Sequence, residues 1–179
     1  MEQKRFGSVL LSEKQIRERV EELGRVITED YADDPPILVN VLKGGFVFLA
    51  DLVRAIDLPV EVDFMEVSSY GDGMTSSGVV RILEDLSESV EGRHVIIVED
   101  IVDTGRTLGY LIENLETRHP KSVKICTLLD RRGRREVELD LDYVGFVVPD
   151  RFVVGYGLDL AQKYRNLPHI AVVEDEEVP

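Results

Sequence analysis

Residues 95–108 read VIIVEDIVDTGRTL, and the fold prediction rests on them. The segment 94–98 is predicted to be a continuous apolar strand, the kind found in the middle of a parallel sheet. A tight polar loop at 103–107 follows it. A helix is expected from about Leu108, with Leu111, Ile112 and Leu115 on its inner face. The stretch therefore predicts a strand, a turn and a helix in direct succession.

Strand and helix alternate through most of the remaining chain. Ser12 is a good helix N-cap, with Gln15 three residues later as in a capping box. The apolar face of that helix and the next comprises Ile16, Val20, Leu23 and Ile27, then Phe46, Leu49, Ala50 and Val53. The other predicted strands are 37–42, 60–67, 124–129, 143–148 and 152–156. This alternation predicts one α/β domain, residues 1–179, with a mostly parallel sheet flanked by helices. Ligands of such folds bind beyond the carboxyl ends of the strands, here after residues 42, 67, 98 and 129.

Composition narrows the class of protein. The 179 residues carry a net charge of −14, which argues against a general nucleic-acid binder. Neither a signal peptide nor an apolar run of membrane-spanning length is expected. Cys126 is the single cysteine, so no internal disulfide can form, which suits the cytoplasm, and its apolar neighbours predict a core position. The acidic tail, about 174–179, is expected to be solvated.

The turn after the central strand contains the parts of a phosphate-binding site. Residues 103–107 offer consecutive backbone N–H groups, two threonine hydroxyls and the positive end of a helix. Gly105 allows an anion to approach the backbone closely. Glu99 and Asp100 would repel a phosphate, so they are expected to bind sugar hydroxyls or a cation that belongs to the substrate.

This block resembles the phosphoribosyl-diphosphate-binding motif of type I phosphoribosyltransferases: an apolar run, two acids, two apolar residues, Asp-Thr-Gly and Thr. The Gly-Lys-Ser/Thr of an ATP-binding P-loop is absent. Residues 42–45 (LKGG), 68–71 (SSYG) and 144–159 resemble further motifs of the hypoxanthine-guanine branch, so the resemblance covers about residues 38–170. It implies the type I fold, with a small hood from the C-terminal and N-terminal segments.

The resemblance also implies a role for each site residue. Phosphoribosyl contacts fall on Glu99, Asp100, Asp103, Thr104, Gly105, Arg106 and Thr107. Diphosphate contacts fall on Lys43, Gly44 and Arg165, with a cis peptide often found before that lysine. Purine contacts fall on Arg131, Phe152, Val153 and Asp159, and Mg²⁺ contacts on Glu99, Asp100 and Asp159. A flexible lid, about 68–78, contains Ser69 and Tyr70. Asp103 is the candidate general base, which would accept the proton of purine N7 while N9 attacks the sugar carbon.

One residue departs from the family pattern. The family usually has a lysine two residues after the Leu-Leu of the fifth strand, where it donates to the 6-oxo group; here Arg131 stands there. Arginine keeps the charge but is planar and bulkier, which leaves open the preference among hypoxanthine, guanine and xanthine. The alternative for Arg131 is a place in a solvated basic cluster with Arg132, Arg134 and Arg135.

The implied activity is transfer of the phosphoribosyl group to hypoxanthine or guanine, giving IMP or GMP. The partners would be phosphoribosyl diphosphate, a 6-oxopurine and Mg²⁺, with no nucleic acid or membrane, in a homodimer or homotetramer. Three alternatives stay open: an enzyme of the same fold for xanthine or a pyrimidine, an RNA- or DNA-binding regulator, and an inactive binding module. The segment 152–159, FVVGYGLD, favours a purine.

Overall fold

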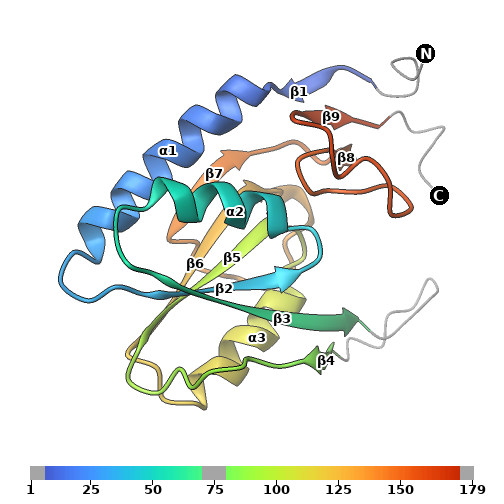
Figure 1. Ribbon diagram of the computed structural model, residues 1–179. Coiled ribbons are helices and arrows are strands. Elements are labelled where there is room, and N and C mark those ends of the chain that lie inside the picture. Colours follow the sequence, from blue (N-terminus) through green and yellow to red (C-terminus); the bar gives the residue numbers. More distant parts are fainter. Residues whose placement is uncertain (1–6, 70–79, 174–179) are drawn as a thin grey trace.

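The computed structural model describes residues 7–69 and 80–173. Its main sheet has six strands in the order β4-β3-β2-β5-β6-β7 (Figure 1). These strands are β2 (Ile37–Leu42), β3 (Glu61–Ser69), β4 (Val80–Glu84), β5 (His94–Val102), β6 (Ser122–Asp130) and β7 (Tyr143–Val147). All neighbours pair in parallel except β3 and β4, which are antiparallel. The predicted mostly parallel sheet is therefore confirmed, and the strand from residue 94 lies at its centre.

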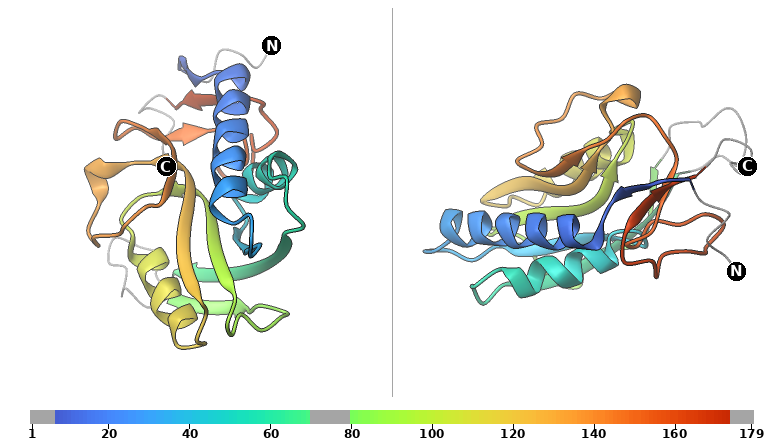
Figure 2. Two further views of the ribbon diagram at one scale, coloured as in Figure 1. Left: turned by 90° about the vertical axis from the view of Figure 1, so that its left-hand side faces the viewer. Right: turned by 90° about the horizontal axis from the view of Figure 1, so that it is seen from above.

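Three helices cover the two faces of this sheet: α1 (Glu13–Asp30), α2 (Phe46–Ala55) and α3 (Arg106–Glu116). α1 and α2 pack on one face and α3 on the other (Figures 1 and 2). Side chains along β5 point alternately to the two faces of the sheet. Ile96 and Val98 face α1 and α2, whereas Val95 and Ile97 face α3. The continuous apolar run at 95–98 is thus the signature of a strand buried on both faces.

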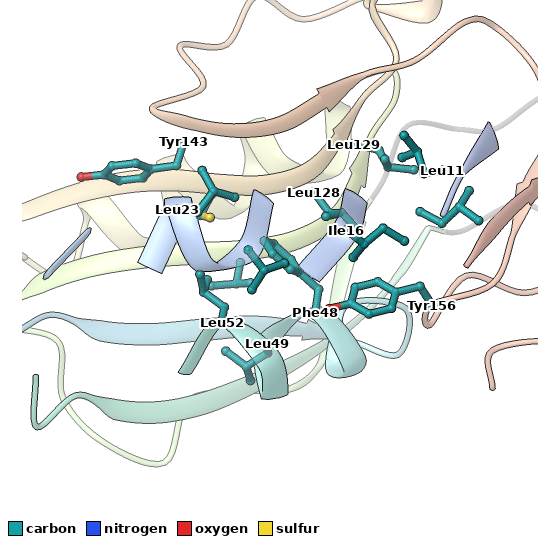
Figure 3. Packing of buried hydrophobic residues seen from close by; sticks show 14 of the residues in the cluster. Leu11, Ile16, Leu23, Phe48, Leu49, Leu52, Leu128, Leu129, Tyr143 and Tyr156 are labelled. Atoms are coloured by element: carbon teal, nitrogen blue, oxygen red, sulfur yellow. The ribbon is translucent and has the colours of Figure 1, made fainter. Parts of the chain in front are cut away.

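The larger core lies between the sheet and the pair α1 and α2. Figure 3 shows Ile16 and Leu23 of α1, Phe48 and Leu52 of α2, and Leu128 of the sheet in one packed cluster. The predicted capping box at Ser12 and Gln15 begins α1, with both reciprocal hydrogen bonds present. Cys126 is fully buried in the same core, as its apolar neighbours predicted.

A second, three-stranded sheet forms the predicted hood. It contains β1 (Val9–Leu11), β9 (Ile170–Val172) and β8 (Val153–Val154), all antiparallel. It joins the N-terminal and C-terminal segments and lies at the end of the molecule toward which the arrowheads of β2 and β3 point (Figure 1). The hood therefore stands beside the carboxyl edge of the main sheet, where a ligand site is expected.

Several elements differ from the prediction. The strand predicted at 94–98 continues to Val102, so Glu99 and Asp100 lie within β5. The strand expected at 152–156 is only Val153–Val154, because Gly155, Tyr156 and Gly157 all have positive φ and turn the chain. α3 begins at Arg106, two residues before the predicted start. β4, β1 and β9 were not predicted as strands. Across the described ranges, no helix is long and apolar enough to cross a membrane.

Candidate active site

Two loops and the end of a strand meet at the carboxyl edge of the main sheet. Gly44 follows β2, Asp100 lies near the end of β5, and Gly157 belongs to the hood turn. A Cβ on Gly44 would lie 1.7 Å from Asp100 Oδ2, and a Cβ on Gly157 would lie 2.1 Å from the Gly44 carbonyl oxygen. Only glycine fits at either position. The peptide between Leu42 and Lys43 is cis, as the resemblance implied.

The predicted phosphate loop joins β5 to α3. Asp103, Thr104, Gly105 and Thr107 line a cavity of about 120 Å³ together with residues of β5 and α3. Gly105, the N-cap of α3, has φ of +82°, a conformation that glycine adopts without a Cβ penalty. The cavity therefore has loop backbone and a helix N-terminus on its walls, and this combination binds anions.

Two acids stand beside this loop with raised pKa values. Burial first, and repulsion by Asp100 second, raise the pKa of Glu99 well above its usual range. Burial raises the pKa of Asp100 to about 6, although the Ile101 N–H donates to Asp100 Oδ1 (2.7 Å) and Arg165 opposes the shift. The protein by itself thus provides too few donors and positive charges to stabilise both carboxylates in their ionised form. This is expected of groups that bind sugar hydroxyls or a cation.

Arg165 and Asp159 come together in the turn that faces Asp100. Arg165 Nη1 donates to the Gly157 carbonyl (2.8 Å), and Nη2 lies 3.0 Å from Asp159 Oδ1. Asp159 Oδ2 accepts from the Gln162 N–H (2.7 Å). Asp159 raises the pKa of Asp100 and Arg165 lowers it, so the three charges form one electrostatic unit. This unit joins the hood to the end of β5.

Asp103 and Arg131, from neighbouring strand ends, form an ion pair. Arg131 Nη2 donates to Asp103 Oδ2 (2.8 Å), while Nη1 donates to the Arg151 carbonyl (3.0 Å). Arg131 is 9% exposed, so it is not a residue of a solvated cluster. Asp103 Oδ1 and Arg131 Nε are buried and find no partner among the described residues. The pair therefore leaves one acceptor and one donor unpaired, and both atoms are closed off from solvent.

The purine-region residues lie at the edge of the hood. Phe152 is half-buried, and its carbonyl accepts from the Val173 N–H (2.8 Å). Val153 is opposite Val172 in the β8–β9 ladder. In an antiparallel ladder, hydrogen-bonded residue pairs alternate with pairs that share no hydrogen bond. Phe152 and Val173 are a hydrogen-bonded pair, so the next pair, Val153 and Val172, shares none. The backbone N–H and C=O of Val153 therefore point away from β9, although its side chain packs in the core.

Some predicted residues lie at the ends of the ranges that the structure describes, or outside them. Ser69 is the last residue of β3. Tyr70, most of the lid at 68–78 and the acidic tail at 174–179 fall outside the described residues. Arg135 is a residue that the motif did not single out: its Nε donates to the Asp103 carbonyl (3.0 Å). The run of arginines after β6 was the available signal, but its contacts depend on how residues 131–137 fold back.

Comparison with known proteins agrees with this geometry. The phosphoribosyl transferase domain family matches residues 8–161. The hypoxanthine-guanine phosphoribosyltransferase of Bacillus subtilis is 53% identical over 166 residues, 93% of this chain and 92% of that protein. The crystal structure of a hypoxanthine phosphoribosyltransferase from Staphylococcus aureus superimposes with a TM-score of 0.93 at 45% identity, covering 96% of this chain and 94% of that chain.

A further relative is much longer than this chain. The bifunctional protein TilS/HprT of Listeria monocytogenes is 54% identical over 168 residues, which is 94% of this chain but 26% of that protein. The chain thus spans about a quarter of the length of that bifunctional relative. With the family match over most of the chain, these findings show that the chain belongs to the phosphoribosyl transferase domain family, in its hypoxanthine-guanine phosphoribosyltransferase branch.

Proposed function

We propose that this protein transfers the 5-phosphoribosyl group of phosphoribosyl diphosphate to hypoxanthine or guanine, giving IMP or GMP and diphosphate. The observation that carries the proposal is that the loop at 103–107 with its small cavity, the half-buried acids Glu99 and Asp100, and the Asp103–Arg131 pair lie at one edge of the sheet. Relatives named hypoxanthine or hypoxanthine-guanine phosphoribosyltransferase are about half identical to the chain over nearly its whole length, which supports the same activity here.

The unpaired atoms of the Asp103–Arg131 pair are chemically complementary to one edge of a 6-oxopurine; because both are buried, the side chains would turn to present them to the base. Atom O6 of the base accepts a hydrogen bond and the adjacent N7–H donates one, so Arg131 would serve O6 and Asp103 would serve N7–H. Adenine carries an amino group in place of O6, which would set donor against donor. Phe152 would stack on the ring, and the outward backbone groups of Val153 would bind the opposite edge of the base.

The reaction is one displacement at the sugar carbon. The lone pair of N9 forms a bond to C1 of the ribose, the bond from C1 to diphosphate breaks with its electrons, and the proton on N7 passes to Asp103. Lys43, Gly44 and Arg165 would hold the departing diphosphate. Glu99 and Asp100 would accept the hydroxyls of the ribose, and residues 103–107 would hold its 5-phosphate. The lid at 68–78 would exclude water from the activated sugar.

Mg²⁺ is the proposed cofactor. The fit rests on Glu99 and Asp100, whose raised pKa values mark carboxylates that a cation would compensate. Within residues 7–69 and 80–173, no three His, Cys, Asp or Glu side chains are arranged to hold a metal by themselves. This suits Mg²⁺, which keeps several waters and binds one or two carboxylates plus substrate phosphates. Glu99, Asp100 and, through water, Asp159 would hold the ion, which when bound neutralises charge on the diphosphate.

Nucleotide formation from phosphoribosyl diphosphate tests the proposal, with hypoxanthine, guanine, xanthine, adenine and uracil in parallel, with and without EDTA. Turnover of hypoxanthine and guanine that EDTA abolishes, with adenine and uracil inert, is the expected result. If no base reacts, the proposed activity is wrong, and a specific gel shift with RNA would then favour an RNA-binding regulator.

We further propose that the protein is a cytoplasmic homodimer or homotetramer. Native mass spectrometry can test the oligomeric state, and cell fractionation can test the location.

A further inference from the structure

The phosphate loop is held from outside by the segment that follows β6. The Thr104 carbonyl accepts two backbone hydrogen bonds, from Glu136 N–H (2.9 Å) and Val137 N–H (3.0 Å). The Asp103 carbonyl accepts one from a side chain, Arg135 Nε (3.0 Å). Two consecutive carbonyls of the loop are thus fixed toward residues 135–137.

This arrangement also fixes the direction of two N–H groups. In a planar trans peptide the C=O and the following N–H point in opposite directions. The N–H groups of Thr104 and Gly105 therefore point away from residues 135–137. Neither of them donates a hydrogen bond to another described residue, whereas a buried backbone N–H is normally paired. These two donors are available to an anion in the cavity that residues 103–107 line.

Arg135 supplies the side-chain hydrogen bond of this outer support, and it is itself anchored. Its Nη2 lies 2.6 Å from Asp130 Oδ1, at the end of β6. The side chain of Asp130 is 3% exposed and that of Arg135 is 17% exposed, so the pair is well shielded from water. A Cβ on Gly105 would lie 3.3 Å from Arg135 Cδ, so the aliphatic stem also packs close to the loop. Arg135 therefore bridges the rigid sheet and the Asp103–Thr104 peptide.

We propose that Arg135 is a positioning residue for the 5-phosphate: it orients the Asp103–Thr104 peptide so that the Thr104 N–H is directed at the phosphate. It touches no substrate atom and acts through the loop. The inference rests on the proposed function, because it assigns the cavity to the phosphate of phosphoribosyl diphosphate and of the product nucleotide. The same peptide carries the Asp103 side chain, so Arg135 also restrains the candidate base.

The test compares Arg135→Met with Arg134→Ala. Methionine keeps an unbranched stem against Gly105 but removes both donors. Arg134 is the matched control, because it lies in the same segment, is 57% exposed and pairs with Asp150 instead of the phosphate loop. Calorimetry gives the affinity for phosphoribosyl diphosphate with Mg²⁺, and inhibition constants compare IMP with inosine, which lacks the phosphate.

We expect Arg135→Met to weaken phosphoribosyl diphosphate and IMP by roughly ten- to a hundredfold, the worth of one hydrogen bond that involves a charged group. Inosine should change less than about twofold, since it does not use the cavity, a difference equivalent to well under one net hydrogen bond. Arg134→Ala should match the wild type throughout. A purely structural ion pair would instead shift IMP and inosine equally, or neither, and either result would overturn the proposal.

Loss of folding is controlled by a second variant. If Arg135→Met unfolds because Asp130 loses a partner, Asp130→Asn/Arg135→Met removes the buried charge as well while the Asp103 carbonyl still lacks its donor. The double variant should fold and show the same selective loss for IMP. If the wild type is active and the double variant binds IMP as tightly as the wild type does, the proposed role of Arg135 is wrong, but the proposed function still stands. Wild-type protein that binds no phosphoribosyl diphosphate contradicts the proposed function, and this inference with it.

Discussion

At the residue scale, the substitution of arginine for the usual lysine ties two proposed roles together. Arg131 holds Asp103 through Nη2 and the Arg151 carbonyl through Nη1, and Nε remains free. A lysine has a single ammonium group and lacks this fixed fork of donors. Arg131 can therefore keep the carboxylate of Asp103 in place and still has an unpaired donor, Nε, which in the proposed function serves the purine oxygen once the side chain turns to uncover it.

Asp103→Asn separates chemistry from binding. An asparagine has nearly the same shape but cannot take up the N7 proton, so we expect kcat to fall by about 10²- to 10⁴-fold, the usual contribution of a general base. The affinity for phosphoribosyl diphosphate should stay nearly unchanged, because the backbone of residue 103 is intact. Single-turnover kinetics and calorimetry measure the two quantities. Equal losses in both would refute the assignment of the base.

Arg131→Lys addresses the selection among bases. Lysine keeps a charged donor for O6 but loses the bond to the Arg151 carbonyl. We expect hypoxanthine and guanine still to react, with the ratio of their kcat/KM values changed by about fivefold, the worth of one net hydrogen bond. Parallel kinetics with hypoxanthine, guanine, xanthine and adenine check this. Activity on adenine would mean that Arg131 does not select the oxo group.

The raised pKa of Asp100 predicts a stability difference that depends on pH. In the unfolded chain this carboxyl ionises near pH 4, and in the fold near pH 6. Between these two pH values the folded state binds more protons than the unfolded state. The contribution of Asp100 to the free energy of unfolding therefore becomes more unfavourable from pH 4 to about 6, and it stays constant at higher pH. Asp100→Asn removes that cost. The unliganded variant should melt higher than the wild type at pH 8 but not at pH 4.

Thermal unfolding followed by circular dichroism measures this difference, with the exposed Asp33 changed to Asn as the control. The control should show no such crossover with pH. A lower melting temperature for Asp100→Asn at pH 8 would mean that the fold compensates this carboxylate without a ligand. The expected gain also has a functional meaning, since binding residues are often retained at the expense of stability.

At the element scale, local patterns predicted what local contacts determine. The capping box at Ser12 and the apolar run at 95–98 located α1 and the start of β5 correctly, because their signals lie within one segment; the end of β5 at Val102, four residues beyond the predicted end, was missed. β1 and β9 have three residues each and pair across the whole chain, as Val9 does with Ala171. No local periodicity reveals such a pairing. β4 is likewise a short edge strand, with its burial pattern mostly exposed.

The same distinction between local and long-range contacts applies to the candidate site. The strand–loop–helix geometry at 103–107 was predicted because its motif is contiguous and follows from a strand, a glycine and a helix start, whereas the phosphate role of this loop stays a prediction. The Asp103–Arg131 ion pair was not predicted, since it depends on two adjacent parallel strands ending at the same level. Arg135 was missed for a related reason: the segment after β6 folds back on the loop through Glu136 and Val137.

Tyr156 joins the hood turn to α2, and this contact can be measured. Its hydroxyl donates to Asp51 Oδ2 (2.6 Å), and burial first and the Asp51 carboxylate second raise the pKa of the phenol. Tyr156→Phe should lower the free energy of unfolding by about 1–2 kcal/mol, because a hydrogen bond to a charged group is lost. Chemical denaturation measures it, with Tyr110→Phe on the exposed side of α3 as the control. Equal stability of both variants would contradict a role for this contact.

At the scale of the whole molecule, the position of Cys126 reports on global opening. It is the only cysteine of the chain, lies in β6 with parallel strands on both sides, and is fully buried. Burial raises the pKa of its thiol, so little thiolate forms at neutral pH, and the thiolate is the reactive form. Reaction with a disulfide reagent therefore requires the central sheet to open.

Ligand binding should slow this reaction in a predictable way. When reclosing is fast relative to thiol modification, the rate follows the population of the open state. A ligand that binds only the folded state, at a hundred times its Kd, stabilises that state by about 2.7 kcal/mol. Phosphoribosyl diphosphate with Mg²⁺ at that concentration should thus slow modification of Cys126 about a hundredfold, and EDTA should remove most of the protection. Protection by the ligand pair would support binding at the sheet edge independently of turnover, since Cys126 faces the core instead of the site. An unchanged rate in the presence of bound ligand would show that β6 is exposed by a local opening, and the thiol would then report on that strand instead of the whole fold.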